Sequence, residues 1–251
     1  MLTEEHVCDE FHASKTYPAR SIDVKRPGCT FENNQTGKKG RSMTLADVLG
    51  QLDAQGAGKA RVTMGPLRAL GKKLKTDHAF ALALWDTGRT DAMLLATMLM
   101  APDRVTAADA TAMLASVTDL QLLDELTYKV VAEAPCADEL CRKWVDAKQE
   151  LTGRAGWNLL VAKLLRKRLD TGECDGILKT IESCCKTAPV KKAESMMRCL
   201  VEIGVRFPEH RQRAIDIGTR WGLIDDRPVP KGCTPFYAPD WIAAILKRQK
   251  N

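Results

Sequence analysis

The sequence predicts an all-α protein, and three observations support this prediction. Aromatic residues make up only 5% of the 251 residues, whereas Leu, Ala and Met are abundant, a composition that favours helix over sheet. From Met43 onward, apolar residues recur at steps of three and four, which is the period of an amphipathic helix. No stretch shows the convincing alternation of apolar and polar residues that marks a half-buried strand.

Helix-capping and helix-breaking residues divide this part of the chain into about a dozen short helices. Ser, Thr and Asp accept hydrogen bonds from the free N–H groups of a first turn, and proline fits that turn because it has no N–H to leave unpaired. Gly88 and Pro102 are typical of helix ends. Helix starts are expected at or just after Thr44, Pro66, Asp77, Thr90, Thr106, Asp119, Pro135 and Pro208.

An internal repeat predicts how these helices pack. The run 87–89 (Thr-Gly-Arg) leads to Leu94-Leu95, the run 152–154 (Thr-Gly-Arg) leads to Leu159-Leu160, and a weaker echo begins at Lys191. Helical hairpins of roughly 35–45 residues that stack side by side form an α-solenoid of the HEAT type, whose concave surface is the usual binding surface. An irregular helical bundle is the alternative.

Residues 1–42 are expected to form a separate segment, mobile or loosely docked, in front of a HEAT-like repeat domain at 43–251. Pro, Gly and Asn interrupt residues 17–41, and no helical period appears there. The basic cluster 38–41 within this segment either touches an anion or belongs to a solvated linker.

Composition and missing motifs restrict the function classes. The longest apolar stretch, 93–102, is about half of what a membrane span needs, and the acidic N-terminus lacks the apolar core of a secretory signal, so we expect a cytoplasmic protein without membrane association. No phosphate-binding, dinucleotide-binding, zinc-protease or serine-hydrolase motif occurs, and no small-molecule cofactor is expected.

The nine cysteines are an odd number at irregular spacing, which argues against a disulfide framework. No pair has Cys-x-x-Cys spacing, and the four histidines lie far from most of the cysteines, so no metal site is expected. Reduced thiols buried on helices are the preferred interpretation.

Positive charge is concentrated in the second half of the chain. Residues 126–251 contain 23 Lys and Arg against 16 Asp and Glu, whereas residues 1–125 contain 15 against 16. Such clusters either follow a phosphate backbone or form solvated surface, where they also complement helix dipoles. The clusters are Lys72, Lys73 and Lys75; Lys163, Arg166, Lys167 and Arg168; and Lys191, Lys192 and Arg198.

Two further charged residues stand in unusual settings. Asp124 lies in a Leu-rich helix and is either a packing partner for an arginine or a carboxylate aimed into a groove. Arg154 precedes Ala155 and Gly156, small residues that permit close backbone approach, and it can fork onto a carboxylate or a phosphate. Trp144 and Trp157 are interpreted as core residues rather than base-stacking platforms.

At these residues the chain resembles the DNA alkylation repair family, HEAT-like repeat proteins that include the AlkD-like alkylpurine DNA glycosylases. The resemblance covers about residues 44–245. It rests on LRALGKKLKTDHAFALALWDTGRTDAMLLATMLMAPDRVTAAD (67–109), TGRAGWNLLVAKLL (152–165), MRCLVEIGVRFPEHRQRAIDIG (197–218) and PKGCTPFYAPDWI (230–242).

The resemblance implies a solenoid that holds duplex DNA on a concave basic face and acts as an N-glycosylase on purines alkylated at N3 or N7. We expect the protein to be a monomer. It puts the catalytic carboxylate on Asp124 and a backbone-contacting arginine on Arg154. The two aromatic lesion-facing positions of the family correspond to Leu120 and Met196, which departs from the family pattern because neither residue is aromatic. The alternatives are a non-catalytic binder of DNA structures and a protein-interaction scaffold.

Overall fold

A computed structural model describes residues 43–58, 61–224 and 235–249 of the chain. The expectations for the segment 1–42 therefore lie outside the described residues. Within these ranges every regular element is a helix, so the all-α prediction is confirmed.

The described elements run in the following order along the chain. They are α1 (Leu45–Gly56), α2 (Met64–Leu74), α3 (His78–Trp85), α4 (Thr90–Leu99), η1 (Pro102–Arg104), α5 (Ala107–Ser116), α6 (Leu120–Glu125), η2 (Leu126–Val130), η3 (Val131–Glu133), α7 (Ala137–Val145), α8 (Glu150–Leu165), α9 (Thr171–Cys184), α10 (Val190–Arg206), α11 (Pro208–Trp221) and α12 (Ala238–Gln249). Of these, η1 and η3 are 3₁₀-helical and η2 is π-helical.

The predicted N-caps form as expected. Thr44 and Thr106 each close a capping box with an aspartate three residues later, and Asp77 and Asp119 each accept a hydrogen bond from the first turn of their helix. Pro208 opens α11. These bonds satisfy N–H groups that have no partner within the helix.

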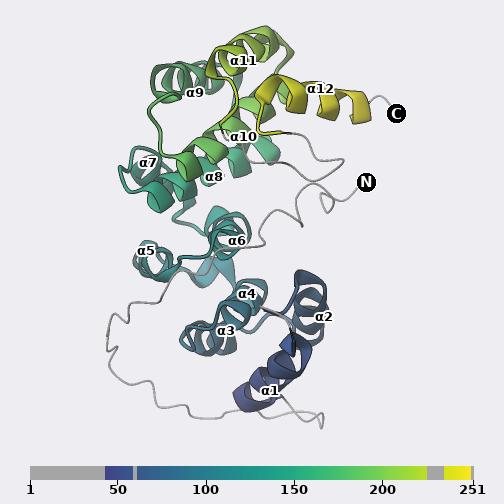
Figure 1. Cartoon of the computed structure of the whole chain (residues 1–251). Coiled ribbons are helices and arrows are strands. Elements are labelled where there is room, and N and C mark those ends of the chain that lie inside the picture. Colours follow the sequence, from purple (N-terminus) through teal and green to yellow (C-terminus); the bar gives the residue numbers. More distant parts are fainter. Residues whose placement is uncertain (1–42, 59–60, 225–234, 250–251) are drawn as a thin grey trace.

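The helices stack in chain order into an elongated body, with α1 at one end and α9, α11 and α12 at the other (Figure 1). Neighbouring helices pair, α3 with α4 and α7 with α8, and α10 then packs on α8, α11 and α12. Near the two ends of the stack, α2 and α12 project to the same side (Figure 1). The shape is that of a short solenoid.

The internal repeat has a structural counterpart with one difference. The three echoes fall on α4, α8 and α10. Residues 87–89 form the turn before α4, where Gly88 adopts a φ of 67°, whereas residues 152–154 already lie inside α8. The same three letters therefore take different backbone conformations, because α8 begins at Glu150, whereas a repeat of α4 would begin at 155.

Two apolar cores meet at α8. Ala155 and Leu159 belong to the core shared with α1 to α7, whereas Trp157 and Val161 belong to the core shared with α9 to α12. A helix that is apolar on all sides is stable only when protein surrounds it. Trp144 and Trp157 are almost fully buried in these cores, as predicted.

None of the described helices is long and apolar enough to span a membrane. The described cysteines, at positions 136, 141, 174, 184, 185 and 199, are free thiols, and four of them are buried. Cys8, Cys29 and Cys233 lie outside the described residues.

Candidate nucleic-acid interface

The site around Asp124 is built where one helix changes its winding. Residues 120–133 run without a break, but α6 passes into the π-helical turn η2 and then into the 3₁₀ turn η3. The Thr127 hydroxyl donates to the carbonyl oxygens of Leu123 (2.9 Å) and Asp124 (3.1 Å). Back-bonding of this kind bends helices, and π turns are frequent at functional sites.

Arg154 of α8 holds the Asp124 carboxylate with two parallel hydrogen bonds. Its Nε donates to Oδ1 at 2.9 Å and its Nη2 donates to Oδ2 at 2.7 Å. The exposed fractions are 8% for the arginine side chain and 24% for the aspartate side chain. The sequence allows Arg154 to bind either a carboxylate or a phosphate, and in the structure it binds a carboxylate.

The other edge of the Arg154 guanidinium contacts α10. Nη1 donates to the Lys191 carbonyl oxygen (2.9 Å) and to Glu194 Oε2 (2.7 Å). Burial opposes the charge on Arg154, but the carboxylates of Asp124 and Glu194 outweigh that effect, so the pKa of Arg154 is raised. One side chain therefore ties together α6, α8 and α10.

Asn158, one turn after Arg154, completes this network. Its Nδ2 donates to Asp124 Oδ1 (2.7 Å), and its Oδ1 accepts from the hydroxyls of Ser195 (2.7 Å) and Tyr128 (3.1 Å). Burial raises the pKa of Tyr128, only partly offset by the nearby Arg198, so the phenol stays neutral and donates. We call Asp124, Tyr128, Arg154, Asn158 and Glu194 the polar seam.

Gly156 lets the backbone of α8 approach the backbone of α7 closely, as the sequence predicts. This close packing positions α8 so that the polar seam can form. A Cβ atom at this position would lie 2.2 Å from the Val145 backbone nitrogen and 2.4 Å from the Trp144 carbonyl carbon. Only glycine allows α7 and α8 to pack this closely.

Comparison with known protein families identifies the family to which the chain belongs. The family described as DNA alkylation repair enzyme matches residues 60–220, well over half of the chain. The chain belongs to the DNA alkylation repair enzyme family. No curated protein matches the sequence.

A solved structure supports the same fold. It comes from work described as "A new family of proteins related to the HEAT-like repeat DNA glycosylases with affinity for branched DNA structures". The two structures superpose with a TM-score of 0.71 at 20% sequence identity, over 82% of this chain and 95% of the other. The HEAT-like repeat fold is thereby confirmed for this member of the DNA alkylation repair enzyme family.

Most cations predicted to contact DNA in this family member are engaged within the protein. Lys163 pairs with Asp138 at 2.7 Å, and Arg166 pairs with Glu133 and donates to the Tyr128 carbonyl oxygen. Such pairs reduce the charge available to a phosphate.

The remaining predicted cations differ in exposure. The Lys192 ammonium donates to the Ala147 carbonyl oxygen (3.1 Å), Lys191 is half-buried, and the Arg198 guanidinium lies over the Tyr128 ring at 5.9 Å from its centre. Lys167 is exposed to solvent.

The two lesion-facing positions inferred from the family resemblance differ in the structure. Leu120 is half-buried at the start of α6, next to the capping residue Asp119. Met196 is fully buried in the second core and has no exposed surface in this structure, and its lesion-facing role stays a prediction from the resemblance. Met196 of α10 belongs, with Trp157 of α8, to the core that α8 shares with α9 to α12.

Sequence reasoning missed three members of the seam, Tyr128, Asn158 and Glu194. Asn158 follows Arg154 by four residues, a spacing that puts both on one helix face, so the sequence alone could have indicated Asn158. Tyr128 and Glu194 come from other helices, and no local pattern links them to Asp124.

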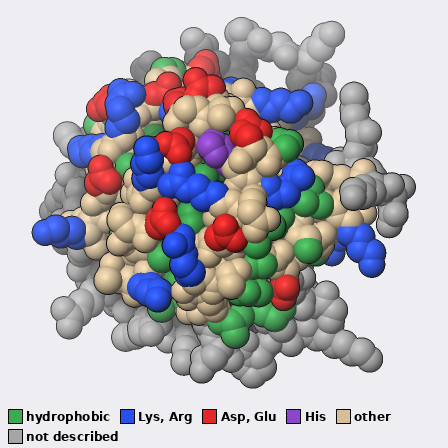
Figure 2. All heavy atoms as spheres, turned by 90° about the horizontal axis from the view of Figure 1, so that it is seen from above, with side chains coloured by type: hydrophobic (Ala, Val, Ile, Leu, Met, Phe, Trp, Pro, Cys, Tyr) green, Lys and Arg blue, Asp and Glu red, His purple; other side chains and the backbone are tan. Residues whose placement is uncertain are grey.

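The end of the stack formed by α9 and α11 carries charges of both signs side by side (Figure 2). Arg213 pairs with Asp175 and Glu182, and Arg220 also pairs with Glu182. Solenoids need a polar outer face on their terminal repeats, and this balanced surface serves as one. No group of metal-ligating side chains converges anywhere in the described part of the chain.

Proposed function

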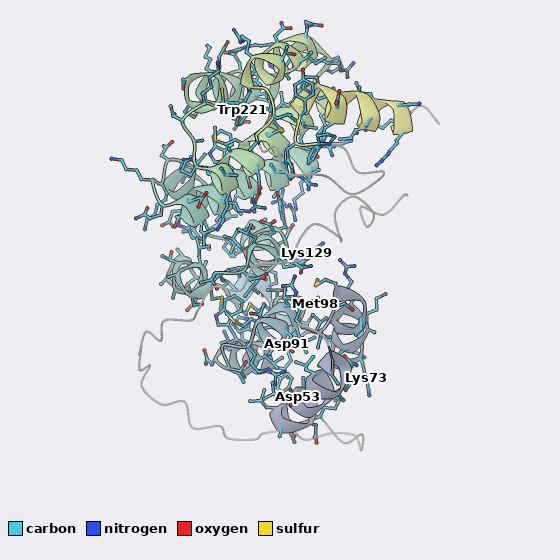
Figure 3. All side chains as sticks on the ribbon, in the orientation of Figure 1. Asp53, Lys73, Asp91, Met98, Lys129 and Trp221 are labelled. Carbon is cyan, nitrogen blue, oxygen red and sulfur yellow. The ribbon has the colours of Figure 1, made fainter. Side chains whose placement is uncertain are left out.

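We propose that this protein is a monomeric DNA-binding member of its family that contacts the phosphate backbone along the side of the stack between α2 and α12. The observation that supports this most is where two cationic helix ends lie. Lys72 and Lys73 close α2, Lys247 and Arg248 close α12, and all four are exposed on helices that project to the same side (Figure 3).

The fold and the ligand fit each other physically. A duplex carries a regular array of negative charge, and cations placed at both ends of a curved stack meet it at separate points along its length. The structural relative has affinity for branched DNA, so we extend the proposal to junctions as well as linear duplexes. Such a function places the protein with the chromosome in a bacterial-type cytoplasm.

A second candidate function is release of alkylated purines, and the observation that favours it is Asp124. Its side chain keeps 24% exposure at the centre of the stack. Alkylation at N3 or N7 makes the purine a cation and a good leaving group. In the proposed reaction the bond from C1′ to the base breaks, its electron pair neutralises the base, and water adds to C1′ and loses a proton. A carboxylate stabilises the positive charge on the sugar and orients this water.

Two measurements on the full chain separate these functions. The first is fluorescence anisotropy with a linear duplex and a four-way junction at several salt concentrations. Contact with about six to ten phosphates predicts a loss of affinity of roughly 10³–10⁵ between about 50 and 200 mM salt. A flat salt response, or no binding, would contradict DNA binding and favour a protein-interaction scaffold.

The second measurement is base release from methylated genomic DNA by the wild type and by Asp124→Asn. Release of 7-methylguanine or 3-methyladenine by the wild type alone supports the glycosylase. No release from either protein, with salt-dependent binding retained, leaves a non-catalytic binder in which Asp124 serves the polar seam. Far-ultraviolet circular dichroism of both proteins checks that the substitution preserves the fold.

A further inference from the structure

Several cations in the middle of the stack are engaged within the protein, among them Arg154, Lys163 and Arg166. Arg154 is the residue that the family resemblance offers, but four of its five N–H donors already bond to Asp124, Lys191 and Glu194. Its side chain is only 8% exposed. Moving it onto a phosphate would leave two carboxylates without their charged partner, which is costly for groups largely removed from water.

Lys129 is the cation carried by the helical run 120–133, the same run that contains Asp124. It is the exposed residue of η2, between the half-buried Tyr128 and the fully buried Val130. None of the ion pairs or side-chain hydrogen bonds found among the described residues involves Lys129. It lies on the side of the stack between α2 and α12, the same side toward which Lys73 lies on α2 (Figure 3).

We propose that Lys129 is the phosphate contact at the centre of the DNA-binding surface, and that Arg154 acts as an internal clamp rather than as a DNA contact. This inference rests on the proposed function. It assigns the central contact to a residue that neither the sequence motifs nor the family resemblance indicates.

The winding of the helix explains why this lysine is available. In a regular α-helix, residues 124 and 129 would differ in direction by about 140°. A π turn takes more residues per turn, so it brings Lys129 back toward the direction of Asp124. The turn thus keeps Tyr128 against Asn158 inside the protein while its neighbour extends into solvent.

The charges along this side also fit one extended polyanion. Lys72 and Lys73 lie near one end, Lys129 in the middle, and Lys247 and Arg248 at the tip of α12. Lysine is suited to phosphate as a compact charge on a flexible stem, and it does not require the fixed geometry of an arginine fork.

The test compares three variants of the full chain, Lys129→Ala, Lys143→Ala and Arg154→Gln. Lys143 is the matched control because it is an exposed lysine of α7, a helix that lies on the side of the stack away from α2 and α12 (Figure 1). Binding to a linear duplex is measured by anisotropy over a series of salt concentrations, and the slope of log K against log salt is compared. Thermal unfolding of each variant is recorded in the same buffers.

Lys129→Ala is expected to reduce the magnitude of the slope by about 0.9, the value for one lost phosphate contact on duplex DNA, and to weaken binding several-fold without changing the unfolding temperature. Lys143→Ala is expected to match the wild type. Arg154→Gln is expected to lower the unfolding temperature and keep the wild-type slope. If Arg154→Gln does not fold, that result agrees with the clamp, and Lys129→Ala still decides the contact.

Two results would overturn the inference while leaving DNA binding intact. One is a wild-type slope in Lys129→Ala, and the other is a slope reduced by about 0.9 in Arg154→Gln at an unchanged unfolding temperature. Failure of the wild type itself to bind DNA would instead overturn the proposed function, and this inference with it.

Discussion

Arg154 on α8 and Asp124 on α6 are joined through both atoms of the carboxylate, by hydrogen bonds of 2.9 and 2.7 Å. A fork of this geometry is directional as well as strong. Because both side chains are largely removed from water, their attraction is screened less than that of a surface pair. The bond fixes α6 against α8 at the point where the helix containing Asp124 changes its winding.

Asp124→Asn should destabilise the protein by about 1–3 kcal/mol, because the buried guanidinium loses a charged partner and one acceptor becomes an N–H donor. Urea unfolding monitored by circular dichroism measures this loss. Asp175→Asn is the control, since Asp175 belongs to an exposed ion-pair network on α9, and its unfolding midpoint should stay at the wild-type value. Equal midpoints for all three proteins would refute a stabilising role for the fork.

Gly156→Ala should cost about 3 kcal/mol or more, because the new methyl group meets backbone atoms of α7 that cannot move aside. Gly176→Ala offers a matched comparison, since nothing lies within 4 Å of a Cβ at that position of α9. There alanine should stabilise the protein by about 0.5–1 kcal/mol, because it favours the helix over the unfolded chain. Chemical denaturation of the two variants and the wild type measures both changes in unfolding free energy, the decrease for Gly156→Ala and the increase for Gly176→Ala.

Stability should fall as the pH rises from 9 toward 11. Burial raises the pKa of the Cys141 thiol from 9.0 to about 11, so its stabilising contribution is complete below the unfolded pKa and is lost as the pH passes through the folded pKa. The loss for this residue is about 2 kcal/mol at pH 11. Cys141→Ala should flatten the profile of unfolding free energy against pH in this window. A variant profile parallel to that of the wild type would contradict the argument.

Asn158→Ala should lower the unfolding free energy by about 2–3 kcal/mol, since the hydroxyls of Tyr128 and Ser195 lose their acceptor. Because Asn158 and Asp124 are bonded directly, their substitutions should not be additive. A double-mutant cycle should give a coupling energy of about 0.5–3 kcal/mol. Additivity within error would mean that the seam does not act as a unit.

The features predicted best from the sequence are those decided within a few residues. Thr44, Asp77 and Asp119 cap helices because each side chain reaches the N–H groups of its own first turn. The π turn was not predicted, since it depends on how Thr127 and Tyr128 meet Asn158 from another helix.

The candidate site shows the same division. Asp124 and Arg154 stand out in the sequence as charged residues in apolar or tightly packed settings, and the structure brings them together. The sequence around Glu194 is typical of an exposed helix surface. Its carboxylate becomes a partner of Arg154 only because α10 packs on α8. Met196 looked accessible from the family resemblance, and packing of the same helix buries it instead.

The two cores that share α8 have a consequence for how the chain comes apart. One face of this helix closes the core made with α1 to α7, and the opposite face closes the core made with α9 to α12. A cut that leaves α8 with either half would expose an apolar stripe that includes either Leu159 or Trp157. Each half therefore needs α8 to complete its apolar core. The two halves should then unfold together in a single cooperative transition.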